Sequence, residues 1–284
     1  MRHCRKKPRR ITIERATKIY WNLHGDKKPS RKSYRTYIRY ICQFFHGRLI
    51  DTISYIDVAN YREWRKKKVC PATVNREHTV ITHLFYQLRK WVDMKIIDPV
   101  TLPKANPGSL VKKEPETARK RILSQNEVKR LLDASSLELQ RVILAAMHTL
   151  LRRKDLRLLT RKNINQMTGC IEGIQAKTGR PYSIPINAIL GKILESAKGS
   201  SIFDFINFRK DFEEAREKAG LPDVQFRDLR RTGARRILKG GFDIATVSSY
   251  LGHASIRMTQ NYVQPEKTDL IKAAEFLENE GWDF

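Results

Sequence analysis

The chain has 284 residues, enough to build one large domain or two modest ones around buried cores. Its four cysteines lie far apart without a C-x-x-C pair, which excludes a disulfide-stapled miniprotein and a cysteine zinc site. Lysine and arginine total 56 against 30 aspartate and glutamate, a formal net charge of +26. This charge favours a polyanionic partner, above all nucleic acid, although ribosomal proteins and anionic-membrane binders share the composition.

The basic excess is concentrated near the amino terminus. Residues 1–50 hold 15 basic and two acidic side chains, whereas residues 263–284 hold two basic and six acidic ones. The opening MRHCRKKPRR indicates a basic tail, and a flexible arm, a nuclear signal or part of an organelle presequence has the same composition. A lysine run at 66–68 is either a solvated helix end or a phosphate-contacting patch. We expect DNA contacts from Arg2, Arg5, Lys6, Lys7, Arg9, Arg10, Lys66, Lys67 and Lys68.

The first hundred residues carry apolar side chains at helical spacing. One such series includes Tyr37, Ile41 and Phe44, and another runs from Val80 to Trp91. A small helical bundle is therefore predicted for a first domain over 1–104. The segment that follows contains prolines, a glycine and many charges without an apolar stripe, which is typical of a linker, here 105–121.

The second domain is predicted over 122–284, ending in an amphipathic helix. Ser124 and Glu127 form an S-x-x-E capping box, so a helix begins there, and a further helical pattern covers about 137–151. The stretch GCIEGIQAKTGRPYSIPI contains two short alternating runs that predict a small antiparallel sheet. Helical patterning resumes at Phe208. The sequence thus predicts a mainly α fold with one small β-sheet.

Sites for cofactors and metals are not indicated. Ala176-Lys177-Thr178 superficially resembles a phosphate loop, but alanine stands where that loop needs glycine before the lysine. Neither an H-E-x-x-H pair nor a carboxylate cluster at metal-ligand spacing occurs. We expect no nucleotide, no metal and no other cofactor. No apolar run reaches the roughly 18 residues that a membrane span requires.

The segment RDLRRTGARRILKGGFDIATVSSYLGHASIRMTQNY closely resembles the signature of the tyrosine recombinase, or phage integrase, family. That signature is an H-D-L-R-H-T box, then L-G-H, then a tyrosine nine residues after the histidine; Arg230, His253 and Tyr262 match it. Upstream, HTLLRRKDLRLLTRKNI resembles the family's T-G-L-R-x-x-E-L box. It aligns Arg152 with the first catalytic arginine and Asp155 with a supporting acid.

Lys177 matches the family's β-hairpin lysine. The resemblance covers about residues 122–262, and the predicted bundle is similar to the family's core-binding domain.

The resemblance implies a site-specific recombinase that cleaves and rejoins DNA without ATP or metal. Tyr262 would attack a phosphodiester and form a 3'-phosphotyrosine. Arg152 and Arg230 would bind the non-bridging oxygens, since planar guanidiniums match phosphate geometry. Lys177 would protonate the 5'-hydroxyl leaving group, and His253 would hydrogen-bond the phosphate or move a proton.

The resemblance also implies the partners. The two domains would form a clamp around double-stranded DNA at a specific target site, and four protomers would assemble on two duplexes. An accessory DNA-bending or directionality protein, a cytoplasmic location in a prokaryotic or phage-infected cell, and no membrane association are expected. The segment KTDLIKAAEFLENE would dock on a neighbouring protomer or on its own domain.

Three positions depart from the family pattern. Arg227 stands where H-x-x-R has histidine, and arginine cannot act as a general base, although it can donate hydrogen bonds to a phosphate. We therefore expect Arg227 in the catalytic set. Arg231 replaces the second histidine, and Leu150 replaces the glycine that precedes the first arginine.

Several other interpretations remain open at this stage. Residues 242–263 also fit the helix, turn and recognition helix of a DNA-binding regulator, although Arg152 and Lys177 are then unexplained. Only Arg227 supports the interpretation as a recombinase-like DNA-binding protein without catalysis. Only the net charge supports a ribosomal or RNA-binding protein. Tyr250 is assigned to the core, and His83 and His148 to core or surface positions rather than ligands.

Overall fold

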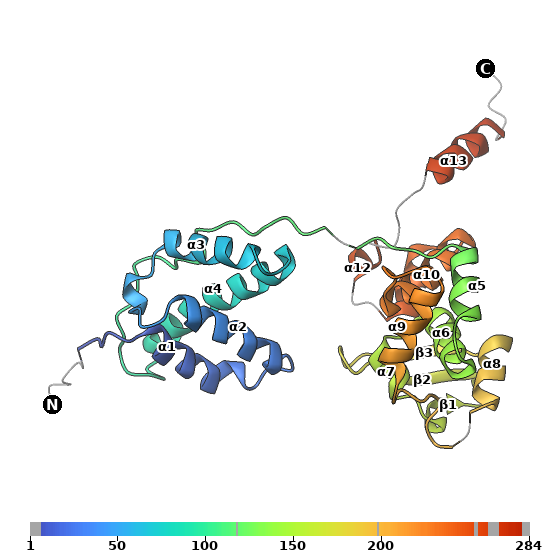
Figure 1. The fold of residues 1–284 in the computed structure, drawn as a ribbon, viewed down its shortest axis with the longest axis horizontal. Helices are drawn as coiled ribbons and strands as arrows, with labels where there is room; N and C mark the ends of the chain where they lie inside the picture. The colour runs from blue at the N-terminus through green and yellow to red at the C-terminus, as the bar shows by residue number, and fades with distance from the viewer. Residues whose placement is uncertain (1–6, 118, 198, 253–254, 261–266, 280–284) are drawn as a thin grey trace. The chain divides into compact units, whose positions relative to one another are not determined.

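The computed structural model describes residues 7–117, 119–197, 199–252, 255–260 and 267–279 (Figure 1). The chain divides into two compact units, Met1–Thr117 and Ala118–Phe284. The division lies inside the segment whose composition predicts a linker.

Helices build the first unit. Its elements are α1 (Ile13–Tyr20), the π-helical turn η1 (Trp21–Gly25), α2 (Arg31–Phe44), the 3-10 turn η2 (Ile50–Thr52), α3 (Tyr55–Lys66) and α4 (Pro71–Asp93). The side chains of Tyr20, Ile41, Phe45, Tyr61 and Leu88 are fully buried between them. Ser54 caps α3 through a capping box with Asp57, and proline opens α4, where its missing N–H is harmless.

The core of this unit also contains a buried ion pair. Arg65 and Glu77 have side chains that are 3% and 1% exposed, and two hydrogen bonds of 2.7 Å join the guanidinium to the carboxylate. Tyr61 donates to the same carboxylate at 2.8 Å, and the Tyr40 ring lies 3.9 Å from the guanidinium carbon. Neighbouring side chains therefore surround this ion pair and shield it from solvent.

The first part of the predicted linker packs on this unit. Arg62 pairs with Glu114 at 2.7 Å and also donates to the Lys112 carbonyl. Asn75 donates to the Glu114 carbonyl and to the Glu116 carboxylate, both at 2.8 Å. Proline-rich composition excludes a helix here, but side chains of α3 and α4 still donate hydrogen bonds to the backbone carbonyls of this segment.

The second unit confirms the predicted fold class. Its elements are α5 (Gln125–Asp133), α6 (Leu137–Thr149), α7 (Arg153–Arg157), η3 (Arg161–Asn163), β1 (Ile164–Asn165), β2 (Cys170–Ile174), β3 (Pro181–Pro185), α8 (Ala188–Glu195), α9 (Phe208–Lys218), α10 (Phe226–Lys239), α11 (Ile244–Leu251), α12 (Ile256–Gln260) and α13 (Lys267–Asn279). The sheet is antiparallel in the order β1-β2-β3, with Ile171 opposite Ile184 on its buried face. The two-residue strand β1 was not predicted.

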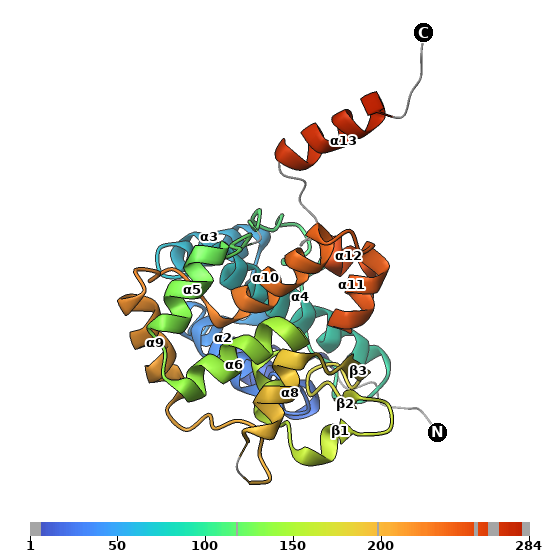
Figure 2. The ribbon, with the colours of Figure 1, turned by 90° about the vertical axis from the view of Figure 1, so that its right-hand side faces the viewer.

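Helices α6 and α10 pack closely in the middle of this unit (Figure 2). Gly233 makes the contact, because a Cβ there would lie 2.2 Å from the Met147 carbonyl oxygen. Ile143, Ala146 and Leu229 fill the surrounding core. This packing holds the middle of α10 beside the end of α6.

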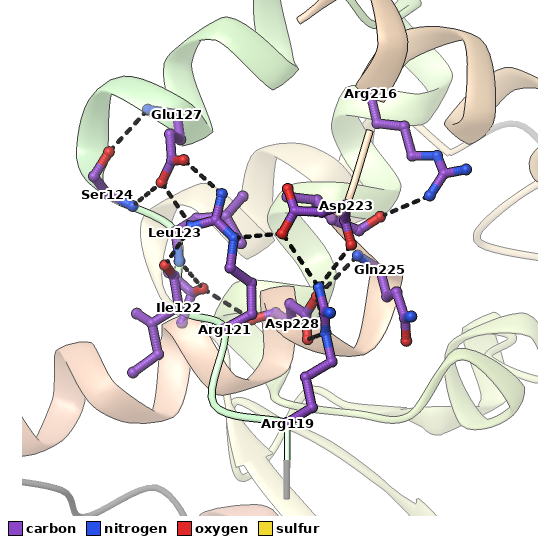
Figure 3. A network of polar contacts seen from close by, with 12 residues as sticks. Arg119, Arg121, Ile122, Leu123, Ser124, Glu127, Arg216, Asp223, Gln225 and Asp228 are labelled. Atoms are coloured by element: carbon purple, nitrogen blue, oxygen red, sulfur yellow. Dashed lines mark hydrogen bonds and ion pairs between the residues drawn. The ribbon is translucent and has the colours of Figure 1, made fainter. Parts of the chain in front are cut away.

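Two arginines tie the incoming chain to the second unit (Figure 3). Arg119 forks around the buried carboxylate of Asp228, with hydrogen bonds of 2.8–3.1 Å. Arg121 pairs with Glu127 at 2.6 Å and with Asp223 at 3.0 Å. The hydrogen bond from Arg121 lowers the pKa of Glu127 to about 2. The segment that contains Arg119 and Arg121 is thus fixed to the starts of α5 and α10.

Candidate active site

Arg152 stands at the start of α7, immediately after a sharp reversal of the chain. Leu150 ends α6 in the left-handed region at φ 52°, ψ 21°, and its side chain is fully buried. A glycine would adopt this conformation freely, whereas leucine is strained by about 1 kcal/mol, which its burial in the small cluster with Val247 and Leu251 offsets. At the glycine position of the signature, Leu150 thus adopts a backbone conformation that glycine would adopt without strain.

The hairpin between β2 and β3 carries Lys177 at its exposed tip. Gly179, at φ 69°, closes the turn, and its N–H donates to the Gln175 carbonyl at 2.9 Å. The loop of the hairpin is held by the buried Asp155, whose Oδ1 accepts from the Ala176 N–H at 2.7 Å. Asp155 thus supports the backbone next to the lysine.

Helix α10 presents the two arginines of its first turns differently. Arg227 is exposed, while Arg230 is only 7% exposed. Between them Asp228 is fully buried, accepts from the Gln225 N–H at 2.9 Å and receives Arg119. Asp228 therefore fixes the helix start, so Arg230 points to the end of α11 and Arg227 to the surface.

The carbonyl of Leu251, the last residue of α11, connects these parts. It accepts from Arg230 Nη2 at 2.9 Å and from Gln175 Nε2 at 3.1 Å, and Gln175 Oε1 accepts from Arg152 Nη1 at 2.6 Å. One hydrogen-bonded chain thus joins α7, the hairpin, α11 and α10. The negative end of the α11 dipole favours a cation at this position.

Gly252 permits the approach of α11 to the hairpin. Its φ is 59°, and a Cβ at this residue would lie 2.1 Å from Gln175 Nε2. Both the left-handed backbone and the close contact therefore require glycine in the L-G-H box.

Two members of the predicted catalytic set, His253 and Tyr262, lie outside the described residues. The predicted residues that the structure brings into one chain are Arg152 and Arg230, with Lys177 on the hairpin that supplies Gln175. Arg227 is exposed one turn from Arg230, in the first turn of the same helix.

Two other tyrosines of this unit have packing roles. Tyr250 is half-buried and donates to the His148 carbonyl at 2.8 Å, as its assignment to the core predicts. Burial raises the pKa of Tyr250 and of Tyr182, which disfavours a phenolate at either position. Burial also lowers the pKa of His148.

The predicted DNA contacts of the first unit differ in their surroundings. Arg2, Arg5 and Lys6 lie outside the described residues. Lys7 is exposed, and Arg9 pairs by its backbone with Val100, so the chain is anchored at Arg9. Arg10 forms an ion pair with Asp51 at 2.8 Å.

The lysine run closes α3 and includes both paired and open side chains. Lys66 pairs with Glu63 and with Glu114, each at 2.8 Å. Lys68 lies 4.9 Å from the Trp64 ring centroid, and Lys67 is exposed. Lys66 therefore serves the structure, because it helps to hold the packed segment around Glu114.

Gln175 and the Leu251 carbonyl were not among the predicted site groups. A glutamine in a hairpin has no distinctive signal, and a backbone carbonyl has none at all. The one available hint was position, two residues before Lys177. Across the described part of the chain, no three histidine, cysteine, aspartate or glutamate side chains gather so as to ligate a metal. None of the described helices combines the length and apolarity that crossing a membrane requires.

Comparisons with known proteins agree with this architecture. The model of the phage integrase family matches residues 121–269, and that of the phage integrase N-terminal domain matches residues 10–104. A putative integrase of Pseudomonas phage Pf1 is 26% identical over 264 residues, 90% of this chain and 76% of that protein.

Two solved structures have the same fold. A lambda integrase dimer bound to a COC' core site aligns with a TM-score of 0.75 at 19% identity, over 97% of this chain and 80% of that one. A lambda integrase tetramer bound to a Holliday junction aligns at 0.70 and 19% identity, over 86% and 78%. With more than half of its residues matched by the family model, the chain belongs to the phage integrase family of site-specific recombinases.

Proposed function

We propose that this protein breaks and rejoins DNA strands at a specific target site through a covalent 3'-phosphotyrosine on Tyr262. The observation that carries the proposal is the hydrogen-bonded chain from Arg152 through Gln175 and the Leu251 carbonyl to Arg230. Three sequence boxes that resemble the recombinase signature supply its members. Neither a helix-turn-helix regulator nor an RNA-binding protein needs two arginines from different helices in one such chain.

The chemistry is a transesterification at phosphorus. The Tyr262 oxygen attacks the phosphorus and gives its proton to His253 or to water, the bond to the 5'-oxygen breaks, and Lys177 gives that oxygen a proton. A 5'-hydroxyl of another strand then reverses the step. The bond count is conserved, so the reaction needs no nucleotide.

The arginines stabilise the charge that develops on the phosphate. Arg152 and Arg230 donate to the non-bridging oxygens in the pentacoordinate transition state, where a preorganised donor contributes about 100- to 1000-fold in rate. His253 hydrogen-bonds the same phosphate, and Asp155 holds the backbone that precedes Lys177. Arg227 acts as a donor, so Arg227→His preserves cleavage.

DNA binding uses both units. In this proposal the bundle over 1–104 and the domain over 122–284 close on double-stranded DNA as a clamp, with the basic residues near the amino terminus as phosphate contacts. Lys7, Arg9 and Lys67 are exposed for this role.

Four protomers assemble on two duplexes, as in the lambda integrase tetramer. Helix α13 contributes by docking on a neighbour, because its apolar side chains Leu270, Phe276 and Leu277 are 61–66% exposed. An accessory DNA-bending or directionality protein and a cytoplasmic location complete the proposal. Deletion beyond Val263 then abolishes multimers on DNA, and unchanged multimers refute docking.

The decisive experiment detects the covalent intermediate. Nicked duplexes tiled across the DNA that flanks the gene are incubated with the full chain, and complexes that survive detergent are mapped. Tyr262→Phe abolishes the complex, whereas Tyr250→Phe, which removes a hydroxyl bonded inside the domain, retains it.

A native binding assay separates the remaining outcomes. Tight binding without a covalent complex on any duplex identifies a recombinase-like binder that lacks catalysis and makes Arg227 the first residue to restore to histidine. Absence of DNA binding refutes the proposal altogether.

A further inference from the structure

We propose that Gln175 is the positioning residue of this active site: its neutral side-chain amide fixes the Arg152 guanidinium relative to the backbone atom that receives Arg230. This inference rests on the proposed function, because it explains how the two arginines are set before a phosphate arrives.

The first argument is that both ends of this amide are hydrogen-bonded, the oxygen twice and the nitrogen once. Gln175 is 1% exposed. Its Oε1 accepts from Arg152 Nη1 at 2.6 Å and from Thr178 Oγ1 at 2.8 Å, while Nε2 donates to the Leu251 carbonyl at 3.1 Å. A buried amide satisfied on both sides has a single orientation, which it transmits to its partners.

The second argument is the origin of the partners. Arg152 comes from α7, Thr178 from the hairpin that carries Lys177, and Leu251 from the end of α11. The Leu251 carbonyl also accepts from Arg230 Nη2 at 2.9 Å. The Gln175 side chain therefore connects the hairpin, α7 and α11 and fixes their relative positions by hydrogen bonds.

The third argument is charge. Within the described residues, Arg152 has no carboxylate at ion-pair distance, and its hydrogen-bond partner is the neutral amide. A carboxylate at this position would hold the guanidinium equally well but would cancel its charge and repel a phosphate. Glutamine instead orients Arg152 and leaves its charge for the DNA.

Close packing provides the fourth argument. The amide fills the space beside Gly252, where a Cβ would lie 2.1 Å from Nε2. The backbone at Gln175 is fixed as well, because its N–H donates to the Arg180 carbonyl at 2.8 Å. The side chain is thus packed against Gly252 at its amide end and anchored through its backbone at the other.

Two substitutions test the proposal on the full chain. Gln175→Met keeps the volume and removes all three side-chain hydrogen bonds, and Gln175→Glu keeps the acceptor for Arg152 while adding charge. Gln140→Met is the matched control, since the Gln140 amide donates to the Leu132 and Ser135 carbonyls at 3.0 and 3.1 Å in the same unit.

The first measurement is the single-turnover rate of covalent complex formation on the mapped nicked duplex at saturating protein. Both Gln175 variants lower the rate about tenfold to a hundredfold, as loss of an orienting partner typically does, with unchanged DNA affinity. Gln140→Met leaves the rate unchanged. A purely structural role would instead reduce the amount of complex formed and leave its rate constant unaltered.

A double-mutant cycle then shows whether Gln175 acts through Arg152. In an Arg152→Lys background, Gln175→Met lowers the rate much less than it does alone, because the orienting contact is already lost. Fully additive effects would overturn the proposal.

A third measurement does not depend on DNA cleavage. It therefore distinguishes failure of this inference from failure of the proposed function. In nitrogen NMR spectra of the free protein, the hydrogen-bonded Arg152 Nη1 rotates slowly and gives a separate signal, identified by its loss in Arg152→Lys. Gln175→Met removes that signal, and Gln140→Met retains it. An unchanged Arg152 signal in Gln175→Met refutes the positioning role whether or not the protein cleaves DNA.

Discussion

The two units bury their arginines beside different partners. In the first unit Arg65 meets the carboxylate of Glu77 through two hydrogen bonds of 2.7 Å, and a tyrosine hydroxyl and an aromatic ring complete its surroundings. In the second, Arg152 meets the amide of Gln175, and Arg230 meets the Leu251 carbonyl. A carboxylate neutralises a guanidinium, whereas an amide or a carbonyl orients it and leaves it charged.

The group that accepts hydrogen bonds from an arginine decides whether its charge remains available to a ligand. The Arg65–Glu77 pair joins α3 to α4 and has no charge left for a ligand. Within the described residues, Arg152 has no carboxylate at ion-pair distance, so its charge stays available for an anion. The same residue type thus forms an ion pair in one unit, whereas in the other the proposed function assigns Arg152 to a phosphate.

The largest effect is expected from Arg65→Met. It leaves the buried Glu77 carboxylate without its cation and destabilises the first unit by about 3 to 5 kcal/mol. Urea unfolding followed by tryptophan fluorescence measures this, since Trp21, Trp64 and Trp91 all lie in that unit. The double variant Arg65→Met with Glu77→Gln recovers much of the loss; if it does not, the pair's charge is not the cause.

Arg152→Lys is expected to act on rate and not on folding. Lysine keeps the charge but loses the fork that meets Gln175 and the phosphate, so covalent complex formation slows by about 100- to 1000-fold. The urea midpoint of the second unit, followed by far-ultraviolet circular dichroism because Trp21, Trp64 and Trp91 lie in the first unit, stays unchanged. A slowing of only a few-fold would mean that charge at this position suffices and that orientation by the amide is unimportant.

Gly252→Ala gives a smaller effect on stability, together with slower cleavage. The left-handed φ of 59° and the collision with Gln175 Nε2 together destabilise the second unit by about 1 to 3 kcal/mol. Gly241→Ala is the control: its φ is 87°, but a Cβ there meets nothing within 4 Å. Equal loss of cleavage rate in both variants would contradict a specific contact between α11 and the hairpin.

The smallest effect is one that the two units share. Asp57 and Glu127 each close a capping box, and hydrogen bonds from Arg48 and Arg121 lower the pKa of both carboxyls to about 2. Their unfolded forms bind protons at higher pH, so this stabilisation is complete above about pH 4.5 and is lost as the pH falls towards 2.

The contribution is about 1 kcal/mol or less for each carboxyl, since both lie near the surface. Urea midpoints at pH 5 and pH 2.5 measure it. Asp57→Asn and Glu127→Gln each flatten the pH dependence of their own unit; a change in the other unit would contradict this assignment.

Local signals were enough to predict much of the fold. Ser124 and Glu127 mark a helix start that the structure reproduces, and the alternating runs on either side of Gly179 form β2 and β3 as predicted. These features depend on neighbours in sequence, where spacing carries the information. Strand β1 was missed because two residues show no alternation.

Long-range features could not be predicted in the same way. The segment around Glu114 lacks helical character, yet Arg62 and Asn75, many residues away, hold it on the first unit. Leu150 replaces the glycine of the signature, and its left-handed backbone and buried side chain could not be read from that replacement. Such outcomes depend on which side chains meet in space, and spacing alone does not specify that.

The Leu251 carbonyl has a consequence for mutational studies of this site. The atom that receives Arg230 and Gln175 belongs to the main chain, so every amino acid at position 251 supplies it equally. An alanine scan would report only the buried leucine side chain there and would leave this acceptor undetected. Replacing the Leu251–Gly252 amide by an ester weakens this carbonyl as an acceptor. The change would test the contribution of a backbone atom that amino-acid substitution does not alter.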